Sequence, residues 1–169
     1  MKNSNCLNKL KPTEKIFWES YIDSLPQNER PKEPHVEASY AGSKRITDKL
    51  IELYLEGKKT AGSSIKEDFI SAGDPLPKVG NFWIILNSNE EPQCLVQTVK
   101  VVENKFYDVP LEIAIAEGEG DLSLEYWRNA HKKFYEPHLE DWGLSRIDDA
   151  TVITEFFAVV YCSSRLSNI

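Results

Sequence analysis

The sequence predicts an α+β fold, a small mixed or antiparallel β-barrel with flanking helices. Apolar residues recur at helical spacing in several stretches, while other stretches alternate or are rich in β-branched and aromatic residues. The predicted strands come in runs with helices inserted between them, whereas a parallel α/β sheet alternates strand and helix regularly. A chain of 169 residues, 41% of them hydrophobic, is long enough to bury one core.

The first part of the chain predicts two helices separated by a loop. Pro12 and Thr13 begin the first helix, which Pro26 stops. Residues 26–42 contain three prolines and no apolar period, so they are expected to form a loop. Ser43 is expected to cap the second helix with its hydroxyl, and Gly57 to end it. The apolar positions of these helices are Ile16, Phe17, Tyr21 and Leu25 in the first and Ile46, Leu50, Leu53 and Tyr54 in the second.

The second part predicts strands with two helices between them. Residues 82–86 form a strand, residues 87–92 a turn, and residues 94–102 an alternating strand. Residues 151–162 are β-branched and aromatic, which predicts a long central strand that closes the sheet. Between these strands, residues 110–116 predict a short helix. A longer helix begins at a cap on Asp121 or Ser123 and runs to about Tyr135.

Composition and charge narrow the class of protein. No apolar run approaches the roughly 20 residues that a membrane span needs, and the N-terminus has no apolar core of a secretion signal. Cys6, Cys94 and Cys162 are widely spaced and odd in number, which indicates reduced thiols in a cytoplasmic protein and neither a zinc site nor a disulfide framework. The formal charge is −7, with +2 on residues 1–60 and −9 on residues 61–169. This balance favours a small ligand, or one nucleotide in a pocket, over a long polyanion.

A first polar segment, residues 57–64, follows the second helix and contains Lys59, Thr60 and Ser63. A lysine beside glycines and hydroxyls can bind an oxyanion or, if desolvated, serve as a base. The segment is not a phosphate-binding P-loop, because that motif lies on a strand-to-helix turn. The alternative is a helix C-terminus whose lysines complement the helix dipole.

A second polar segment, residues 117–121, alternates acids and glycines as Glu117, Glu119 and Asp121. The spacing does not match a calcium loop. Two neighbouring carboxylates can divide acid and base roles, and Lys59 is the expected partner of this segment. The alternative is that the acids only complement the N-terminus of the following helix.

The helix after the acidic segment places Ser123, Trp127 and His131 on one face, with Arg128 beside them. Trp127, together with Tyr40, could stack on a base, and Arg128 could hold a phosphate or carboxylate. A tryptophan at helical spacing can equally belong to the core, and a single histidine can be structural. His131 and His138 have no third ligand, so no zinc site is expected.

Taken together, these motifs resemble the ASCH domain family, in particular its bacterial stand-alone branch of unknown function. The resemblance covers roughly residues 36–162. It rests on the Gly57-x-Lys59-Thr60-Ala61 segment, the turn at residues 75–80 and, most specifically, the Glu117–Phe134 run with its Glu-Gly-Glu-Gly-Asp start. We therefore expect residues 36–169 to form this domain and residues 1–35 an N-terminal helical extension. The resemblance implies a PUA-like β-barrel and a cleft where the Gly-x-Lys motif meets it.

The resemblance also implies a function. Family members are thought to bind RNA or nucleotides; one branch hydrolyses the acetyl group of N4-acetylcytidine, and another member is reported as a metal-dependent ribonuclease. By motif, the amidohydrolase lysine falls on Lys59 and its glutamate on Glu119, whereas its threonine falls on Gly62. Thr60 or Ser63 would then have to supply the hydroxyl.

Three hypotheses follow. In the first, the protein is a hydrolase of a modified nucleoside or of RNA, with Lys59 and Glu119 catalytic. In the second, it is a non-catalytic reader of a nucleotide or RNA, and in the third its polar segments are only structural. The residues expected to contact the ligand are Tyr40, Thr60, Ser63, Asp121, Ser123, Trp127, Arg128 and His131. No cofactor is expected, the resemblance leaves a divalent metal open, and the sequence does not predict the oligomeric state.

Overall fold

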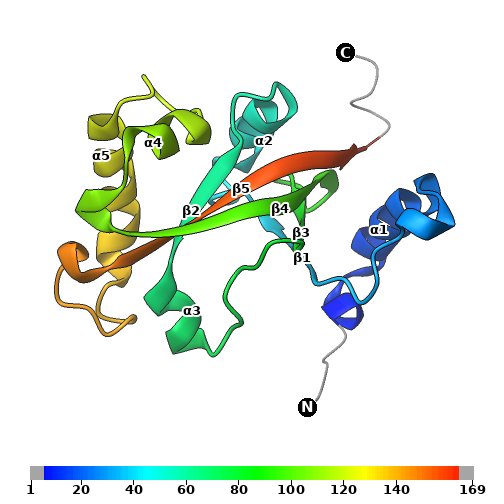
Figure 1. Ribbon diagram of the computed structural model, residues 1–169, viewed down its shortest axis with the longest axis horizontal. Helices are drawn as coiled ribbons and strands as arrows, with labels where there is room; N and C mark the ends of the chain where they lie inside the picture. The colour runs from blue at the N-terminus through cyan, green and yellow to red at the C-terminus, as the bar shows by residue number, and fades with distance from the viewer. Residues whose placement is uncertain (1–5, 164–169) are drawn as a thin grey trace. The chain divides into compact units, whose positions relative to one another are not determined.

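The computed structural model describes residues 6–163, which form the α+β arrangement of Figure 1. The helices are α1 (Pro12–Ser24), α2 (Thr47–Leu55), α3 (Lys66–Ala72), α4 (Leu111–Glu117) and α5 (Leu124–Tyr135). The strands are β1 (Val36–Tyr40), β2 (Ala61–Ile65), β3 (Phe82–Leu86), β4 (Pro92–Lys105) and β5 (Thr151–Cys162). Single 3-10 turns are η1 (Cys6–Lys9), η2 (Gln27–Glu29), η3 (Phe106–Asp108), η4 (Glu136–His138) and η5 (Ile147–Asp149). The ends of the two expected domains, residues 1–5 and 164–169, lie outside the described residues.

The strands pair in the order β1-β3-β4-β5-β2. β1 pairs with β3 in parallel, whereas β3 with β4 and β2 with β5 pair antiparallel, so the sheet is mixed as expected. β5 lies between β4 and β2, which confirms the prediction that residues 151–162 form an interior strand.

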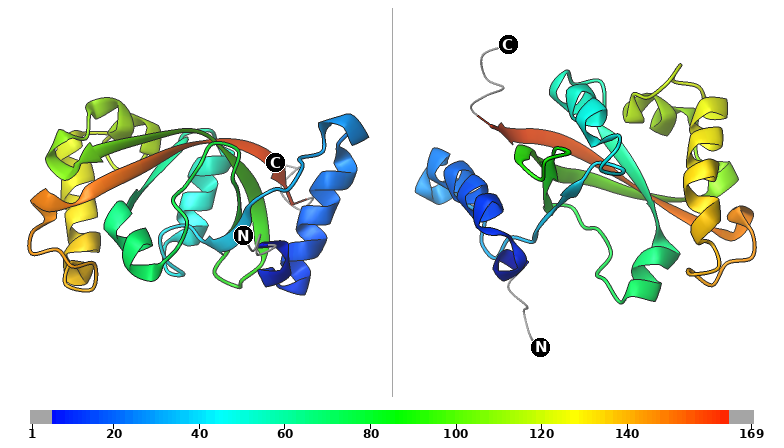
Figure 2. Two further views of the ribbon diagram at one scale, coloured as in Figure 1. Left: turned by 60° about the horizontal axis from the view of Figure 1, so that its bottom comes forward. Right: turned by 180° about the vertical axis from the view of Figure 1, so that it is seen from behind.

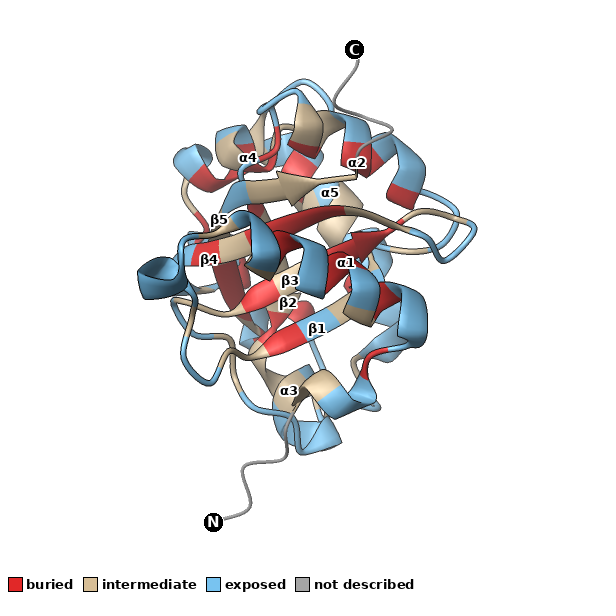
Figure 3. Cartoon of the chain, turned by 90° about the vertical axis from the view of Figure 1, so that its right-hand side faces the viewer, coloured by how far each residue is buried: buried red, intermediate tan, exposed pale blue. Residues whose placement is uncertain are grey.

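The chain divides into two compact units, and β4 and β5 contribute residues to both. The first unit contains residues 6–56, 80–98 and 158–163 of the described part. Its core joins α1 to β1, β3 and β4 through large aromatic and aliphatic side chains, among them Trp18, Tyr21, Phe82 and Ile84. The ring of Trp18 meets that of Phe82 edge to face, with 5.0 Å between centroids. In Figure 3 strand β3, which packs with α1, is largely buried, and the outward face of α1 is exposed.

The second unit contains residues 57–79 and 99–157 and carries both polar segments. Helices α4 and α5 lie side by side in this unit (Figure 2). Their inward side chains form its core with η3 and β5, led by Phe106, Ile113, Trp127 and Val152, which are all buried. Burial of such side chains contributes about 1.5–3 kcal/mol each relative to an exposed position. This core fixes the position of α5 and therefore of the side chains on its inner face.

Several expectations about local structure are confirmed. The first helix runs from Pro12 to Ser24, and Gly57 follows the end of the second with a positive φ of 72°. Helix α5 begins after Ser123, whose hydroxyl accepts a hydrogen bond from the N–H of Tyr126 at 3.0 Å. No helix among residues 6–163 is both long enough and apolar enough to cross a bilayer.

Two expectations about the first part of the chain are wrong. The predicted loop at 26–42 contains strand β1, whose short alternating pattern follows the prolines and is completed by pairing with β3. Ser43 does not cap the second helix, which begins only at Thr47. The carbonyl of Ser43, not its hydroxyl, accepts from the N–H groups of Ile46 and Thr47. The buried hydroxyl of Thr47 donates to the Leu86 carbonyl at 2.6 Å, so it ties the helix start to β3.

The sequence did not predict β2 or α3. β2 has the sequence Ala-Gly-Ser-Ser-Ile, which is poor in β-forming residues, and it is a strand because it pairs along its length with β5. This strand lies directly after Lys59 and Thr60, so the segment whose alternative interpretation was a helix C-terminus is also the entry to the sheet.

Candidate functional site

The main chain around Lys59 is held between α4 and β5. The N–H of Thr60 donates to the carbonyl of Ala116 at 2.7 Å, and the Thr60 carbonyl accepts from the N–H of Phe157 at 2.8 Å. Backbone bonds of this kind do not depend on side-chain identity. They place the start of β2 directly beside the C-terminal end of α4, where the acidic segment begins.

Gly118 makes the approach of these two segments possible. It ends α4 in the left-handed conformation, with φ at 69°, which glycine adopts without steric cost. A Cβ atom at this position would lie only 2.1 Å from the carbonyl oxygen of Lys58. Only glycine therefore fits between the two backbones, and its absence of a side chain lets Glu117 and Glu119 lie next to Lys59.

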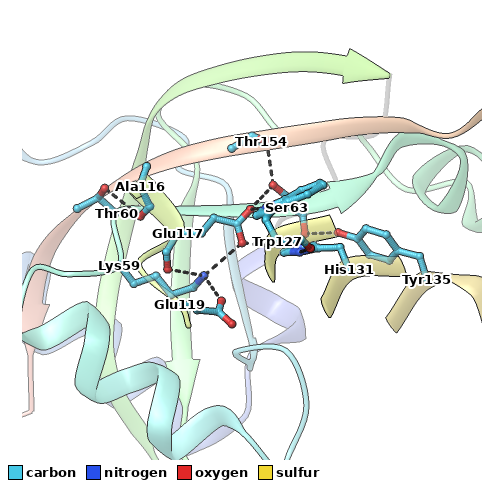
Figure 4. A network of polar contacts seen from close by, with 10 residues as sticks. All are labelled: Lys59, Thr60, Ser63, Ala116, Glu117, Glu119, Trp127, His131, Tyr135 and Thr154. Carbon is cyan, nitrogen blue, oxygen red and sulfur yellow. Dashed lines mark hydrogen bonds and ion pairs between the residues drawn. The ribbon is translucent and has the colours of Figure 1, made fainter. Parts of the chain in front are cut away.

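The expected contact between Lys59 and Glu119 is confirmed (Figure 4). The Nζ atom of Lys59 lies 2.7 Å from Oε1 of Glu119. The same ammonium lies 3.6 Å from Oε2 of Glu117 and 3.4 Å from the Glu117 carbonyl oxygen. The Lys59 side chain is only 5% exposed, whereas that of Glu119 is 27% exposed. Glu119 is therefore the member of this ion pair that solvent reaches.

Glu117 is a buried carboxylate with a donor on every side. Its Oε1 atom accepts from the Nε1–H of Trp127 at 2.8 Å and from the hydroxyl of Ser63. Its Oε2 atom lies 3.2 Å from Nε2 of His131. Burial raises the pKa of Glu117, but His131, Lys59 and Ser63 outweigh it and lower that pKa to about 2. The carboxylate is therefore ionised in the folded protein at neutral pH.

His131 is held between two acceptors. Its Nδ1 atom lies 2.8 Å from the carbonyl oxygen of Trp127, and its Nε2 atom faces the ionised carboxylate of Glu117. Neither partner can donate a hydrogen, so this geometry favours the imidazolium form, in which both ring nitrogens carry one. The ring also stacks on Trp127, with 4.0 Å between centroids and 16° between planes. The cluster thus brings the nitrogens of Lys59 and His131 against the carboxyl groups of Glu117 and Glu119.

Ser63, on β2, connects this cluster to the sheet. Its hydroxyl shares a 2.9 Å hydrogen bond with the buried hydroxyl of Thr154 on β5, and its carbonyl accepts from the Tyr135 hydroxyl at 2.8 Å. Burial, followed by the charges of Glu117 and Glu119, raises the pKa of Tyr135 well above its ordinary value. Tyr135 thus stays a neutral donor at this position.

The other residues expected at the site are placed as follows. The Thr60 hydroxyl donates to the Ala116 carbonyl at 3.2 Å, and Thr60 is exposed. Asp121 accepts from the N–H of Ser123 at 2.9 Å, and these hydrogen bonds lower its pKa. Ser123 caps α5. All three lie on the two polar segments or directly after them, and their side chains bind main-chain groups.

Two further residues that were expected to contact the ligand have their partners elsewhere. Arg128 is directed at η3, where its Nη2 atom donates to the Tyr107 carbonyl at 3.1 Å and its guanidinium lies 5.9 Å from the Tyr107 ring centre. Tyr40 belongs to the first unit, and its hydroxyl donates to Glu90 at 3.3 Å. Trp127 does join the cluster, but it is only 3% exposed, so little of its ring is available to stack on a base.

The sequence interpretation did not place Glu117 among the site residues. It was considered only as one acid of the segment expected to bind Lys59, whereas it is the central acceptor of the cluster. The available signal was the helical spacing of Trp127 and His131, because two polar aromatic groups on one inward face require an acceptor to bind. Within residues 6–163, no group of three or more His, Cys, Asp or Glu side chains is arranged to hold a metal ion.

Comparison with known proteins places this arrangement in a described family. The family of the ASCH domain matches residues 37–161. The chain is similar to the ASCH domain of Lactobacillus crispatus JV V101, with 26% identity and a TM-score of 0.83 over 90% of this chain and 96% of that one. It is also similar to a protein of Enterococcus faecalis V583, with 26% identity and a TM-score of 0.77 over 92% of each chain. No curated protein matches. The α+β, PUA-like fold class predicted from the sequence is therefore confirmed.

Proposed function

The chain belongs to the ASCH domain family, and from that premise we propose that it binds RNA or a modified nucleoside at the Lys59 cluster and hydrolyses it. The observation that carries the proposal is the ion pair of a buried ammonium with a partly exposed carboxylate, contributed by segments 60 residues apart. The functional domain in this proposal spans residues 36–169, with residues 1–35 as an extension.

The cluster supports a division of roles between Lys59 and Glu119. The ammonium faces two carboxylates, so it suits the stabilisation of negative charge that develops on a carbonyl or phosphoryl oxygen. Glu119 is reached by solvent and hydrogen bonds to this ammonium, so it suits the transfer of a proton from water. A ligand oxygen that binds Lys59 takes the place of the Glu119 carboxylate, which releases that carboxylate to act as the base.

Glu117 supports both roles without contacting the ligand. Its carboxylate is fixed by Trp127 and His131 and lies behind the Lys59 ammonium, where it is 3% exposed. When Glu119 moves aside, Glu117 still neutralises the lysine and holds it in place. This arrangement allows the exposed partner of the ion pair to exchange while the buried one stays fixed.

The proposal is tested by turnover of N-acylated nucleosides and short single-stranded RNAs, with and without added Mg²⁺ or Mn²⁺. The wild type is compared with Lys59→Met and Glu119→Gln, and each variant is expected to lose roughly 100-fold or more in rate. The matched control is Lys66→Met with Glu103→Gln, which removes an exposed lysine–glutamate pair of 2.9 Å elsewhere in the same unit.

Thermal-shift titration with the same compounds separates binding from catalysis. A ligand that stabilises the wild type but is not turned over would replace the hydrolase with a non-catalytic reader. Equal turnover in the wild type, both site variants and the control would refute the catalytic roles of Lys59 and Glu119. Absence of both binding and turnover across the panel would leave the cluster with a structural role only.

A further inference from the structure

A second group of reactive side chains lies in the first unit, apart from the Lys59 cluster and unused by the proposed reaction. Cys6 begins the 3-10 turn η1, which packs beside β1. His35 directly precedes β1, and Glu37 is two residues further along the chain. Side chains two apart on an extended backbone share one face, so these two can meet without distortion.

The imidazole ring of His35 lies between the thiol of Cys6 and the carboxylate of Glu37. The Sγ atom of Cys6 lies 3.2 Å from Nδ1 of His35, and Oε1 of Glu37 lies 2.9 Å from Nε2 of the same ring. The thiol and the carboxylate thus occupy opposite nitrogens. They are not directed at a common point, as the ligands of a metal ion would be.

The position of the hydrogens follows from the partners. An ionised carboxylate only accepts, so Nε2 carries the hydrogen that is donated to Glu37. In the neutral ring Nδ1 then keeps its lone pair, and that lone pair faces the Cys6 thiol. A thiol beside a base that is itself oriented by a third group is the arrangement of an activated nucleophile.

The other two cysteines lack this arrangement. Cys94 is buried, and burial, followed by the neighbouring Cys162, raises its pKa to about 12. Burial likewise raises the pKa of Cys162, which is half-buried. Cys6 is also only half-buried, and the side chains of His35 and Glu37 are 27% and 64% exposed. All three residues of this group are therefore at least partly exposed to solvent.

We propose that Cys6, His35 and Glu37 form a thiol-exchange site that reacts with small-molecule disulfides. Exchange requires only a thiolate and access to it, whereas acyl transfer would also require donors for an oxyanion. The site is independent of the proposed hydrolysis, since its residues lie in the other unit and have no part in that reaction.

The exchange moves one proton and replaces one S–S bond with another. The thiol proton moves to Nδ1 of His35, and the resulting imidazolium donates to the thiolate through Nδ1 and to Glu37 through Nε2. The Cys6 thiolate attacks one sulfur of the disulfide, so a new S–S bond forms as the S–S bond of the reagent breaks. The departing thiolate takes the proton from His35. Cys6 is oxidised to a mixed disulfide, and half of the reagent is reduced to a thiol.

The experiment measures mixed-disulfide formation at each cysteine of the full chain. The folded protein is incubated with oxidised glutathione at pH 7, quenched with acid, and digested, and mass spectrometry follows the occupancy of each site with time. An ordinary thiol is only a few per cent thiolate at this pH. Cys6 is therefore expected to react roughly tenfold faster than Cys162, and the two rates are expected to converge in urea.

Variants of His35 and Glu37 show whether Cys6 reacts quickly because these residues activate its thiol or only because it is exposed. His35→Asn keeps a hydrogen-bonding oxygen near the position of Nδ1 but cannot take a proton, and it is expected to slow Cys6 roughly tenfold. Glu37→Gln is expected to slow it about threefold, while Cys162 changes in neither variant. Circular dichroism establishes that both variants fold. If Cys6 reacts no faster than Cys162, or at the same rate in His35→Asn as in the wild type, the proposal is wrong.

Discussion

The carboxylate of Glu117 lies 3.2 Å from Nε2 of His131, in a position where the glutamate side chain is 3% exposed. Two groups so close and so little solvated have a large effect on the free energy of unfolding, because removal of either one leaves the other buried with fewer partners. Their interaction is therefore best examined through the stability of the protein and its dependence on pH.

Glu117 is expected to make the protein acid-sensitive. Its pKa is about 2 in the folded state and 4.5 when unperturbed, so its ionised form contributes stability in full above pH 4.5. That contribution, on the order of 3 kcal/mol, is lost as the pH falls from 4.5 towards 2. Urea unfolding at pH 7, 5, 4 and 3 measures it. The stability difference between the wild type and Glu117→Gln should shrink below pH 4.5; a difference that stays constant with pH contradicts the prediction.

His131→Gln tests the charge on the other side of this pair. The glutamine amide can donate to Glu117 from about the position of Nε2, but it carries no charge. Since a hydrogen bond to a charged donor contributes more than one to a neutral donor, the variant should be about 1–2 kcal/mol less stable at pH 5. The control is His138→Gln, at an exposed histidine of the same unit. Equal effects of the two substitutions would count against the imidazolium assignment.

Gly118→Ala tests the close approach of the two polar segments. An added Cβ would meet the Lys58 carbonyl at 2.1 Å, so one backbone must move. Gly73 provides the comparison, since its φ of 71° is almost the same as the 69° of Gly118, but nothing lies within 4 Å of its added Cβ. Gly73→Ala should cost about 1–2 kcal/mol from backbone strain, and Gly118→Ala roughly 2 kcal/mol more. Urea unfolding of both variants measures these losses in the free energy of unfolding. Similar losses for the two variants would refute the steric argument.

Ser123→Ala measures the start of α5. Loss of its hydroxyl leaves the Tyr126 N–H without that acceptor, so stability should fall by about 1 kcal/mol. Ser20 serves as the control, because it lies inside α1 on an exposed position and its hydroxyl only donates back to the Ile16 carbonyl. Ser20→Ala should be neutral or slightly stabilising. A Ser123→Ala variant as stable as the wild type in thermal unfolding would show that α5 does not depend on this cap.

The sequence was sufficient to predict the long periodic elements and a contact between Lys59 and the acidic segment, within which the family resemblance selected Glu119. That contact was predictable because the two segments carry opposite charges and neither could be buried alone. The role of Glu117 was not predictable, because an acidic residue at the end of a short helix is commonly just a solvated surface residue. Its neighbours Trp127 and His131 become informative only once α5 is known to turn them inward.

Strands β1 and β2 were not predicted for a similar reason. β2 consists mostly of small polar residues, and its conformation is determined by β5, which is almost 90 residues away in the sequence. β1 follows a proline-rich stretch that obscures its alternation. In both cases the decisive interaction is a pairing between distant segments, which a local pattern does not contain.

The junction of Lys58–Thr60 with Ala116–Gly118 relies on main-chain atoms and on one missing side chain. The other side chains at this junction can therefore change one at a time while the two backbone segments stay in the same relative position. Substitutions of the side chains at positions 60, 63 and 119 should therefore preserve this frame, whereas a side chain at Gly118 would displace it.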